Sequence, residues 1–416
     1  MSRRVHHTPE TSFTSVPEEA AVLETYVTLD KKLEKKLKRR SRQSQKLAAA
    51  SLIIASIATP YWLDVESNRA EQAAAEVSIN LIADPIDEAN EHKAIVLADG
   101  FNTSNGDYLT KIIGPAIQQV ADGRLMSLGN NNASLGRENI FNKLVETANE
   151  YDINTYVFVG YSMGGIIAIE AAADIVSKSD INVSLITPMH TPNGLDGLQE
   201  NQQKELGFIQ LLADWMPGAV DSSWVRFGGE LYFYKDNYTK GTFDDWNIAQ
   251  NIGVVTDNVG RFGRTASSVW KTVNDPKHAS MQLLTEQGFK ISQFDMLDEL
   301  KTISEQSDKK QMPLLMYVRM KNDALVKNEE SSEAFRKDAQ ETDIRFYSYL
   351  VPDAIHAQYY KSEEEYMRMF GLASLSIKRG IQEETAKHAF FLLNQESDVT
   401  EKAEEIPATV PDQGAK

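Results

Sequence analysis

The stretch Thr155–Val176, TYVFVGYSMGGIIAIEAAADIV, decides the fold of this 416-residue chain. Its first part, TYVFV, consists of β-branched and aromatic residues, which predicts a short buried strand. Its last part, from Ile166 to Val176, is rich in Ala and Ile and has only Glu170 and Asp174 as charges. That composition predicts a helix buried on most of its surface. The stretch therefore predicts a strand–turn–helix unit with a very short turn.

The turn has the spacing Gly-x-Ser-x-Gly, from Gly160 to Gly164. Side chains at either glycine would collide with the chain across so tight a turn, and Ser162 between them is forced into a strained conformation. The strain lifts the Ser162 hydroxyl clear of the sheet, as in a nucleophile elbow. The N–H of Met163 lies at the helix N-terminus, which favours negative charge. Ser162 is thus a candidate nucleophile and Met163 a candidate oxyanion-hole donor; the alternative is an ordinary glycine-rich turn.

The composition of the chain argues against several kinds of partner and functional site. The net charge of −17 argues against a nucleic-acid partner for the body of the protein. The chain has no cysteine, which rules out disulfides, thiolate metal sites and a cysteine nucleophile. The sequence shows neither a metal-ligand cluster nor a phosphate-binding loop, so we expect no metal and no cofactor.

The N-terminal region has its own charge pattern. Residues 1–46 contain 11 Lys/Arg and 6 Asp/Glu, and we expect them to form a disordered basic leader. Residues 47–63, LAAASLIIASIATPYWL, carry no charge and have the aromatic pair Tyr61-Trp62 near their far end, which is typical of a short membrane-spanning helix or signal anchor. The basic flank predicts a single-pass protein with a cytoplasmic N-terminus and an extracytoplasmic catalytic domain.

Two alternatives to the membrane helix remain open. The segment can be a cleaved signal peptide, with Ser56-Ile57-Ala58 as the small-residue cleavage site and a secreted mature protein. It can also be a soluble amphipathic helix. In either case residues 64–76, rich in Ala and Glu, read as a helical spacer.

Strand and helix patterns alternate over residues 77–394. This alternation predicts an α/β fold with a mostly parallel, doubly wound sheet that has helices on both faces. Functional residues are then expected beyond the carboxyl ends of the strands. Strands are predicted at 77–82, 93–98, 124–128, 155–159, 183–186, 314–318 and 344–351, and helices at 108–120, 138–151, 166–176 and 331–340, with a terminal helical region up to Asn394. Residues 395–416 are acidic and contain Pro, which predicts a disordered tail.

Residues 190–311 interrupt this rhythm. The segment is helical and aromatic in texture and includes Trp215, Trp224, Trp246 and Trp270. An insertion at this place emerges at the active-site edge of the sheet, so we expect a helical cap over Ser162. Its aromatic residues either pack the cap's own core or line an apolar pocket for an acyl or aromatic group.

A serine nucleophile requires a base and an acid that orients the base. His356 follows the last predicted strand, from where it can reach Ser162, and is the candidate base; His278 in the insertion is the competitor. Asp323 is the first carboxylate after the preceding strand and is the candidate acid. His190 follows the strand after the buried helix and is expected to form part of a pocket wall. The order Ser…Asp…His fits a triad.

The second oxyanion donor is expected in the loop Asp99-Gly100-Phe101, after the predicted strand 93–98. Gly100 lets the backbone approach a substrate, and the N–H of Phe101 is the candidate donor. Asp99 is expected to fix this loop by hydrogen bonds rather than to act in catalysis.

These motifs resemble those of α/β-hydrolase-fold serine hydrolases over residues 77–394. Relatives commonly have His-Gly where this chain has Asp99-Gly100, a departure that leaves a backbone donor intact. The resemblance implies a serine hydrolase that cleaves a carboxylic ester or related acyl bond of a small-molecule or lipid-like substrate, and the N-terminal segment predicts that this hydrolase is tethered to a membrane. Tyr161, His190 and Trp215 are the expected substrate-pocket residues. An acyltransferase with the same triad, or a non-catalytic member that binds a ligand or partner, are the alternative functions.

Overall fold

The computed structural model describes residues 76–100, 106–129, 135–215, 281–306, 309–356 and 358–404, with scattered residues between 28 and 74, 218 and 227, and 257 and 268. The chain forms two compact units, Met1–Asp64 and Val65–Lys416. The described residues of the first unit are helical. The second unit contains every strand among the described residues and all the site residues discussed below.

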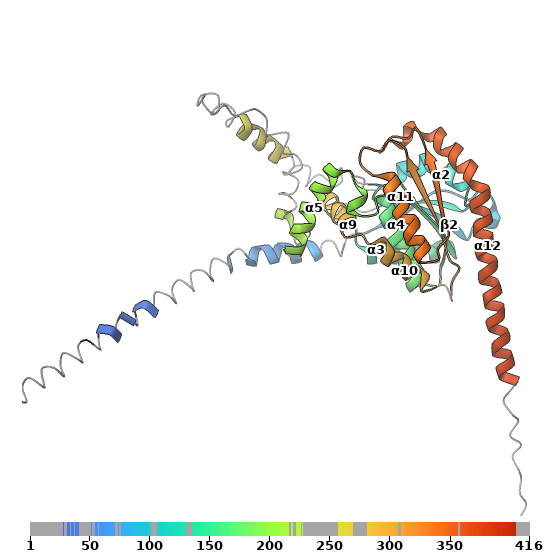
Figure 1. Ribbon diagram of the computed structural model, residues 1–416, viewed down its shortest axis with the longest axis horizontal. Coiled ribbons are helices and arrows are strands. Elements are labelled where there is room, and N and C mark those ends of the chain that lie inside the picture. Colours follow the sequence, from blue (N-terminus) through green and yellow to red (C-terminus); the bar gives the residue numbers. More distant parts are fainter. Residues whose placement is uncertain are drawn as a thin grey trace, which may run out of the picture. The chain divides into compact units, whose positions relative to one another are not determined.

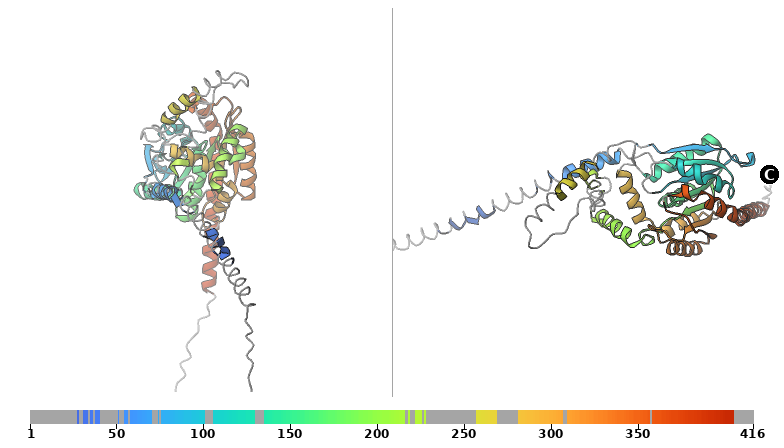
Figure 2. Two further views of the ribbon diagram at one scale, coloured as in Figure 1. Left: turned by 90° about the vertical axis from the view of Figure 1, so that its left-hand side faces the viewer. Right: turned by 90° about the horizontal axis from the view of Figure 1, so that it is seen from above.

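The second unit is built on a seven-stranded sheet with the order β1-β3-β2-β4-β5-β6-β7. β1 pairs antiparallel with β3, and the other neighbouring pairs are parallel. This confirms the predicted mostly parallel sheet, and the alternation of strand and helix can be followed by colour in Figure 1 and Figure 2. The strands are β1 (Ser78–Ala83), β2 (Lys93–Ala98), β3 (Arg124–Gly129), β4 (Thr155–Tyr161), β5 (Asn182–Met189), β6 (Leu314–Met320) and β7 (Phe346–Val351).

Helices cover both faces of the sheet, as predicted. One buried apolar cluster joins the strands to α3 (Arg137–Tyr151), α4 (Gly164–Lys178), α10 (Met296–Ser304) and α11 (Asn328–Glu341). A second cluster, on the opposite face, joins them to α2 (Asp107–Gln118) and α12 (Glu363–Glu404). Figure 1 shows α12 on the other side of β2 from α4 and α10.

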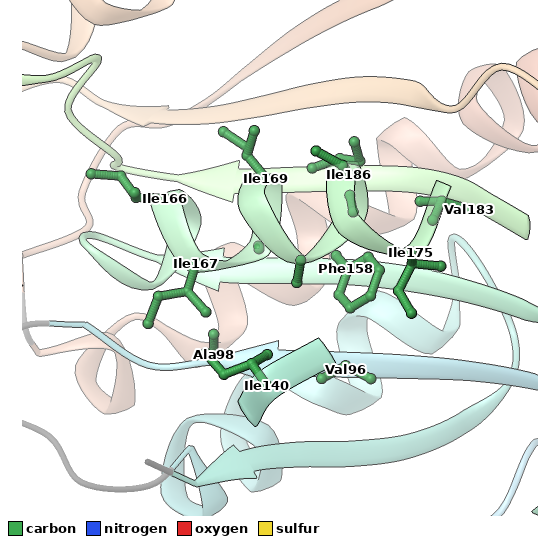
Figure 3. Packing of buried hydrophobic residues seen from close by; sticks show 14 of the residues in the cluster. Val96, Ala98, Ile140, Phe158, Ile166, Ile167, Ile169, Ile175, Val183 and Ile186 are labelled. Atoms are coloured by element: carbon green, nitrogen blue, oxygen red, sulfur yellow. The ribbon is translucent and has the colours of Figure 1, made fainter. Parts of the chain in front are cut away.

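Among the described helices that contribute to the first cluster, the helix that follows the Gly-x-Ser-x-Gly turn is the most deeply buried. Residues Gly164–Ala173 of α4 are buried except at Glu170, which confirms the helix predicted from the Ala- and Ile-rich composition. Figure 3 shows the isoleucines of α4 among Val96, Phe158 and Ile186 of the neighbouring strands. Because these side chains are removed from water, their burial stabilises the packing of the helix on the sheet.

The segment predicted as a cap contains α5 (Glu200–Trp215), α9 (Met281–Gln293) and α10 among its described residues. All three are helices, as the sequence indicates. The last of them, however, is part of the layer that covers the sheet, because it buries Met296, Leu300 and Ile303 against that layer's core. Most of the central part of the segment, with Trp246, Trp270 and His278, lies outside the described residues.

The chain ends differ in part from the predictions. α12 continues to Glu404, so the predicted end of the helix near Asn394 and the predicted disorder from Gln395 are wrong for residues 395–404. The physical reason is that Glu, Lys and Ala dominate the end of this stretch, and the first proline after it is Pro407. Within the described part of the chain, no helix is both long and apolar enough to cross a membrane. About half of residues 47–63, and most of residues 1–46, lie outside that part.

Candidate active site

The turn between β4 and α4 holds Ser162 in a left-handed conformation, with a φ of 54°. A Cβ on Gly160 would overlap the carbonyl oxygen of Gly164, and a Cβ on Gly164 would overlap that of Ala98. Both overlaps are with backbone, which cannot move aside as a flexible side chain can. The predicted strained turn is therefore confirmed, and the two glycines are required by its geometry.

The side chains of Ser162, His356 and Asp323 meet beyond the carboxyl ends of β4, β7 and β6. His356 Nε2 lies 2.9 Å from Ser162 Oγ, and His356 Nδ1 lies 2.7 Å from Asp323 Oδ2. The side chains of His356 and Asp323 are 6% and 1% exposed, so the hydrogen bond between them is shielded from water. A carboxylate can only accept, so Nδ1 carries the imidazole proton and Nε2 is free to accept from the serine hydroxyl.

Three hydrogen-bond donors besides His356 hold the carboxylate of Asp323 in place. Its Oδ1 accepts from the N–H groups of Leu325 and Val326 at 2.8 and 3.1 Å, and its Oδ2 accepts from Asn328 Nδ2 at 2.7 Å. Burial raises the pKa of Asp323, but the hydrogen bonds from His356 and from the two backbone groups outweigh burial and lower it below its ordinary value. The carboxylate is therefore ionised at neutral pH and fixed in orientation.

Asn328 is the functional-site residue that sequence reasoning missed. It is the first residue of α11, it is 5% exposed, and its side chain also receives the N–H of Met320 at 3.4 Å. Asn328 thus links the end of β6 to the acid. The sequence offered one indication of this role. Asn328 is a polar residue that lies between the apolar pair Leu325-Val326 and the acidic residues at the start of the next predicted helix.

The oxyanion loop comes very close to the nucleophile. A Cβ on Gly100 would lie 3.0 Å from Ser162 Cβ and 3.6 Å from Ser162 Oγ, so a side chain at this position would crowd the nucleophile. Met163 occupies the N-cap position of α4, and among the described residues its N–H donates no hydrogen bond. Phe101, the other predicted donor, lies outside the described residues.

Asp99 makes the hydrogen bonds expected of a residue that fixes the loop. Its Oδ1 accepts from the Gly100 N–H at 2.7 Å, and its Oδ2 accepts from the Tyr359 hydroxyl at 3.0 Å. Since the Gly100 N–H is engaged in this way, it is not the oxyanion donor, and the next N–H along the loop remains the candidate.

Tyr161 and His190 pack directly against the base. The ring of Tyr161 contacts those of His356 and His190 with centroid distances of 5.6 and 5.2 Å. His190 has a φ of 52°, is fully buried, and places Nε2 2.7 Å from the Tyr366 hydroxyl. Burial, together with a smaller effect of the nearby His356, lowers the pKa of His190 to about 3, so His190 is neutral. Neither side chain presents surface to solvent, and the side chain of Trp215 lies outside the described residues, so the pocket roles of all three stay predictions.

The comparisons with known proteins are structural only. No protein-family model matches the sequence, and no curated protein is similar to it in sequence. Similar solved structures include MenH from S. aureus, 15% identical, with 74% of this chain and 99% of that one covered and a TM-score of 0.41. An esterase from Exiguobacterium antarcticum is 11% identical, with 73% and 96% covered and a TM-score of 0.40. The enzyme MGS-M2, an alpha/beta hydrolase from a Medee basin deep-sea metagenome library, is 13% identical, with 70% and 92% covered and a TM-score of 0.40.

Because β4, β6 and β7 are parallel, the three loops that follow them lie at the same edge of the sheet. These loops follow β4, β6 and β7 and carry Ser162, Asp323 and His356 in that order along the chain. With the strained serine between β4 and α4, this arrangement is that of the α/β-hydrolase fold.

Proposed function

We propose that this protein is a serine hydrolase that cleaves a carboxylic ester or a related acyl bond through an acyl-enzyme on Ser162. The observation that carries the proposal is the continuous hydrogen-bonded chain from Ser162 Oγ through the His356 imidazole to Asp323. Its distances are those required for proton transfer from nucleophile to base.

In the proposed reaction Ser162 Oγ attacks the carbonyl carbon while His356 Nε2 takes the hydroxyl proton. The substrate oxygen becomes an oxyanion that accepts hydrogen bonds from the Met163 N–H and from the predicted Phe101 N–H. His356 then gives its proton to the departing alcohol, and the acyl group stays on Ser162. Water enters, loses a proton to His356 and releases the acid, which restores the serine hydroxyl. Asp323 keeps the imidazole in the required tautomer throughout.

We propose an uncharged, apolar acyl group as the preferred substrate part. The support is the aromatic composition of the insertion and the net charge of −17, which disfavours anionic substrates. Tyr161, His190 and Trp215 are the proposed pocket residues. Hydrolysis of p-nitrophenyl esters of increasing chain length by the wild type and a Trp215→Ala variant tests this. A flat profile that the substitution leaves unchanged would contradict it.

We further propose that residues 47–63 tether the protein to a membrane, with the N-terminus cytoplasmic and the hydrolase domain outside. The support is the uncharged run after a basic leader. The full-length protein should then sediment with membranes and resist extraction by high salt, and protease added outside should reach the domain. Recovery in the cytosolic fraction would contradict the tether and leave the hydrolase proposal standing.

The hydrolase proposal is tested with p-nitrophenyl butyrate and two variants. Ser162→Ala and His356→Ala should each lower kcat by at least ~1000-fold, and the double variant should be little worse, because the triad acts as a unit. His388→Ala, a histidine change on α12, is the matched control and should leave kcat unchanged. Turnover by Ser162→Ala at the wild-type rate would refute the proposal.

A further inference from the structure

Asp99 connects two loops that carry different parts of the site. It directly follows β2, is 7% exposed, and receives one hydrogen bond from the oxyanion loop, at Gly100, and one from Tyr359. Tyr359 belongs to the same loop as His356, and its side chain is also buried. The two residues are 260 positions apart in the sequence, so this contact exists only because the fold brings the ends of β2 and β7 to one edge.

Burying this carboxylate opposes folding. Its two hydrogen-bond partners are both neutral, and burial raises the pKa of Asp99 above its ordinary value although both hydrogen bonds act in the opposite direction. A buried carboxylate without a cationic partner loses hydration that hydrogen bonds from neutral groups recover only in part. Burial also raises the pKa of the Tyr359 hydroxyl, which therefore remains protonated and keeps donating. Two apolar side chains could fill the same space without this cost. The hydrogen-bonded pair of Asp99 and Tyr359 therefore indicates that the contact fixes the position of the two loops.

The place of the contact indicates what it positions. Among the described residues of the oxyanion loop, Gly100 lies close to Ser162, since a Cβ at this position would be 3.0 Å from Ser162 Cβ, and its N–H donates to Asp99. The ring of Tyr359 stacks edge-on against Tyr161 with centroids 5.3 Å apart, and Tyr161 in turn contacts His356 at 5.6 Å. One hydroxyl–carboxylate bond thus joins the oxyanion loop to the loop and ring that support the base.

We propose that Asp99 and Tyr359 form a positioning pair that holds the oxyanion loop in register with the loop of His356. The pair touches neither the substrate nor the reacting atoms, and it acts through the alignment of the oxyanion donor with Ser162. The proposal rests on the hydrolase function proposed above. Misplacement of an oxyanion donor by about 1 Å costs on the order of 100-fold in rate, which sets the size of the expected effect.

The test is a double-mutant cycle on p-nitrophenyl butyrate hydrolysis. Asp99→Ala and Tyr359→Phe should each lower kcat by roughly 10- to 100-fold with KM changed by less than about threefold, because the pair acts on the transition state. The double variant should be no slower than the slower single one, since both substitutions remove the same bond. Asp99→Asn should recover most of kcat, because an amide can accept from Gly100 and donate to the Tyr359 oxygen.

Tyr156→Phe is the matched control, because Tyr156 is also buried and donates its hydroxyl to the Leu144 carbonyl at 2.7 Å, but at the opposite end of β4. It should lower the melting temperature and leave kcat of the folded protein unchanged. Multiplicative losses in the double variant, a loss confined to KM, or no recovery with Asp99→Asn would overturn the positioning role. A wild-type protein inert toward the ester would overturn both proposals, whereas an active wild type with unaffected variants would overturn only this one.

Discussion

At the scale of single residues, the site depends on which atom of His356 carries a proton. Asp323 determines this, because its Oδ2 faces Nδ1 and leaves Nε2 for Ser162. Asn328 and the N–H groups of Leu325 and Val326 hold the carboxylate in place by donating to both of its oxygens. The acid therefore orients the base, and other residues orient the acid.

An Asp323→Asn variant tests this tautomer argument. The amide can present its NH2 group to Nδ1, which moves the imidazole proton to Nε2, where it blocks acceptance from Ser162. We expect kcat to fall by about 10³- to 10⁴-fold with little loss of stability, as for a triad with the wrong tautomer. Steady-state kinetics and a thermal melt provide the two measurements. An Asn328→Ala variant is the comparison: three donors to the acid remain, so its loss should be much smaller, and equal losses would contradict the argument.

His190 predicts a pH dependence of stability. Its pKa of about 3 in the folded protein lies below its ordinary value of 6.5, so the folded state binds the proton less well than the unfolded state. The contribution of neutral His190 to the free energy of unfolding is fully present above pH 6.5. It is lost as the pH falls below this value, by about 1.4 kcal/mol per pH unit at most. We expect urea unfolding between pH 7 and 5 to show this slope in the wild type and not in His190→Asn, since Asn tolerates the positive φ. Parallel curves for the two proteins would contradict the assignment.

At the scale of elements, the turn between β4 and α4 imposes the strictest requirement on the sequence. A Cβ at Gly160 meets backbone atoms of Gly164 and Gly165, whereas a Cβ at Gly371, on the exposed face of α12, meets only the Gln119 side chain at 3.5 Å. Substitution of alanine for Gly160 should therefore lower the stability of the protein, whereas the same substitution at Gly371 should raise it.

Gly160→Ala should destabilise the protein by about 1–3 kcal/mol or more, because the overlap can be relieved only by moving the turn. Gly371→Ala should stabilise it by about 0.5–1 kcal/mol, since alanine loses less backbone freedom in a helix interior. Denaturant unfolding of the two variants against the wild type gives both values. A Gly160→Ala protein as stable and as active as the wild type would show that the turn is looser than the geometry indicates.

At the scale of the whole molecule, local patterns predicted the sheet and its helices because each strand is short, apolar and bounded by polar turns. The same patterns placed Ser162, Asp323 and His356 at strand ends, where a parallel sheet brings them together. Contacts between distant segments were not predictable in this way. Asn328, the packing of α10 against the sheet layer, and the bond of Asp99 to Tyr359 depend on which loops face each other, which periodicity does not encode.

The most direct test of the central claim is covalent labelling of the protein by a fluorophosphonate probe, followed by intact and peptide mass spectrometry. The account predicts one probe adduct per chain on the peptide that contains Ser162. It also predicts no adduct in Ser162→Ala and slow labelling in His356→Ala, because the base activates the nucleophile. A wild-type protein that stays unlabelled while correctly folded, or a Ser162→Ala protein that labels as fast as the wild type, would contradict the claim that Ser162 is an activated nucleophile.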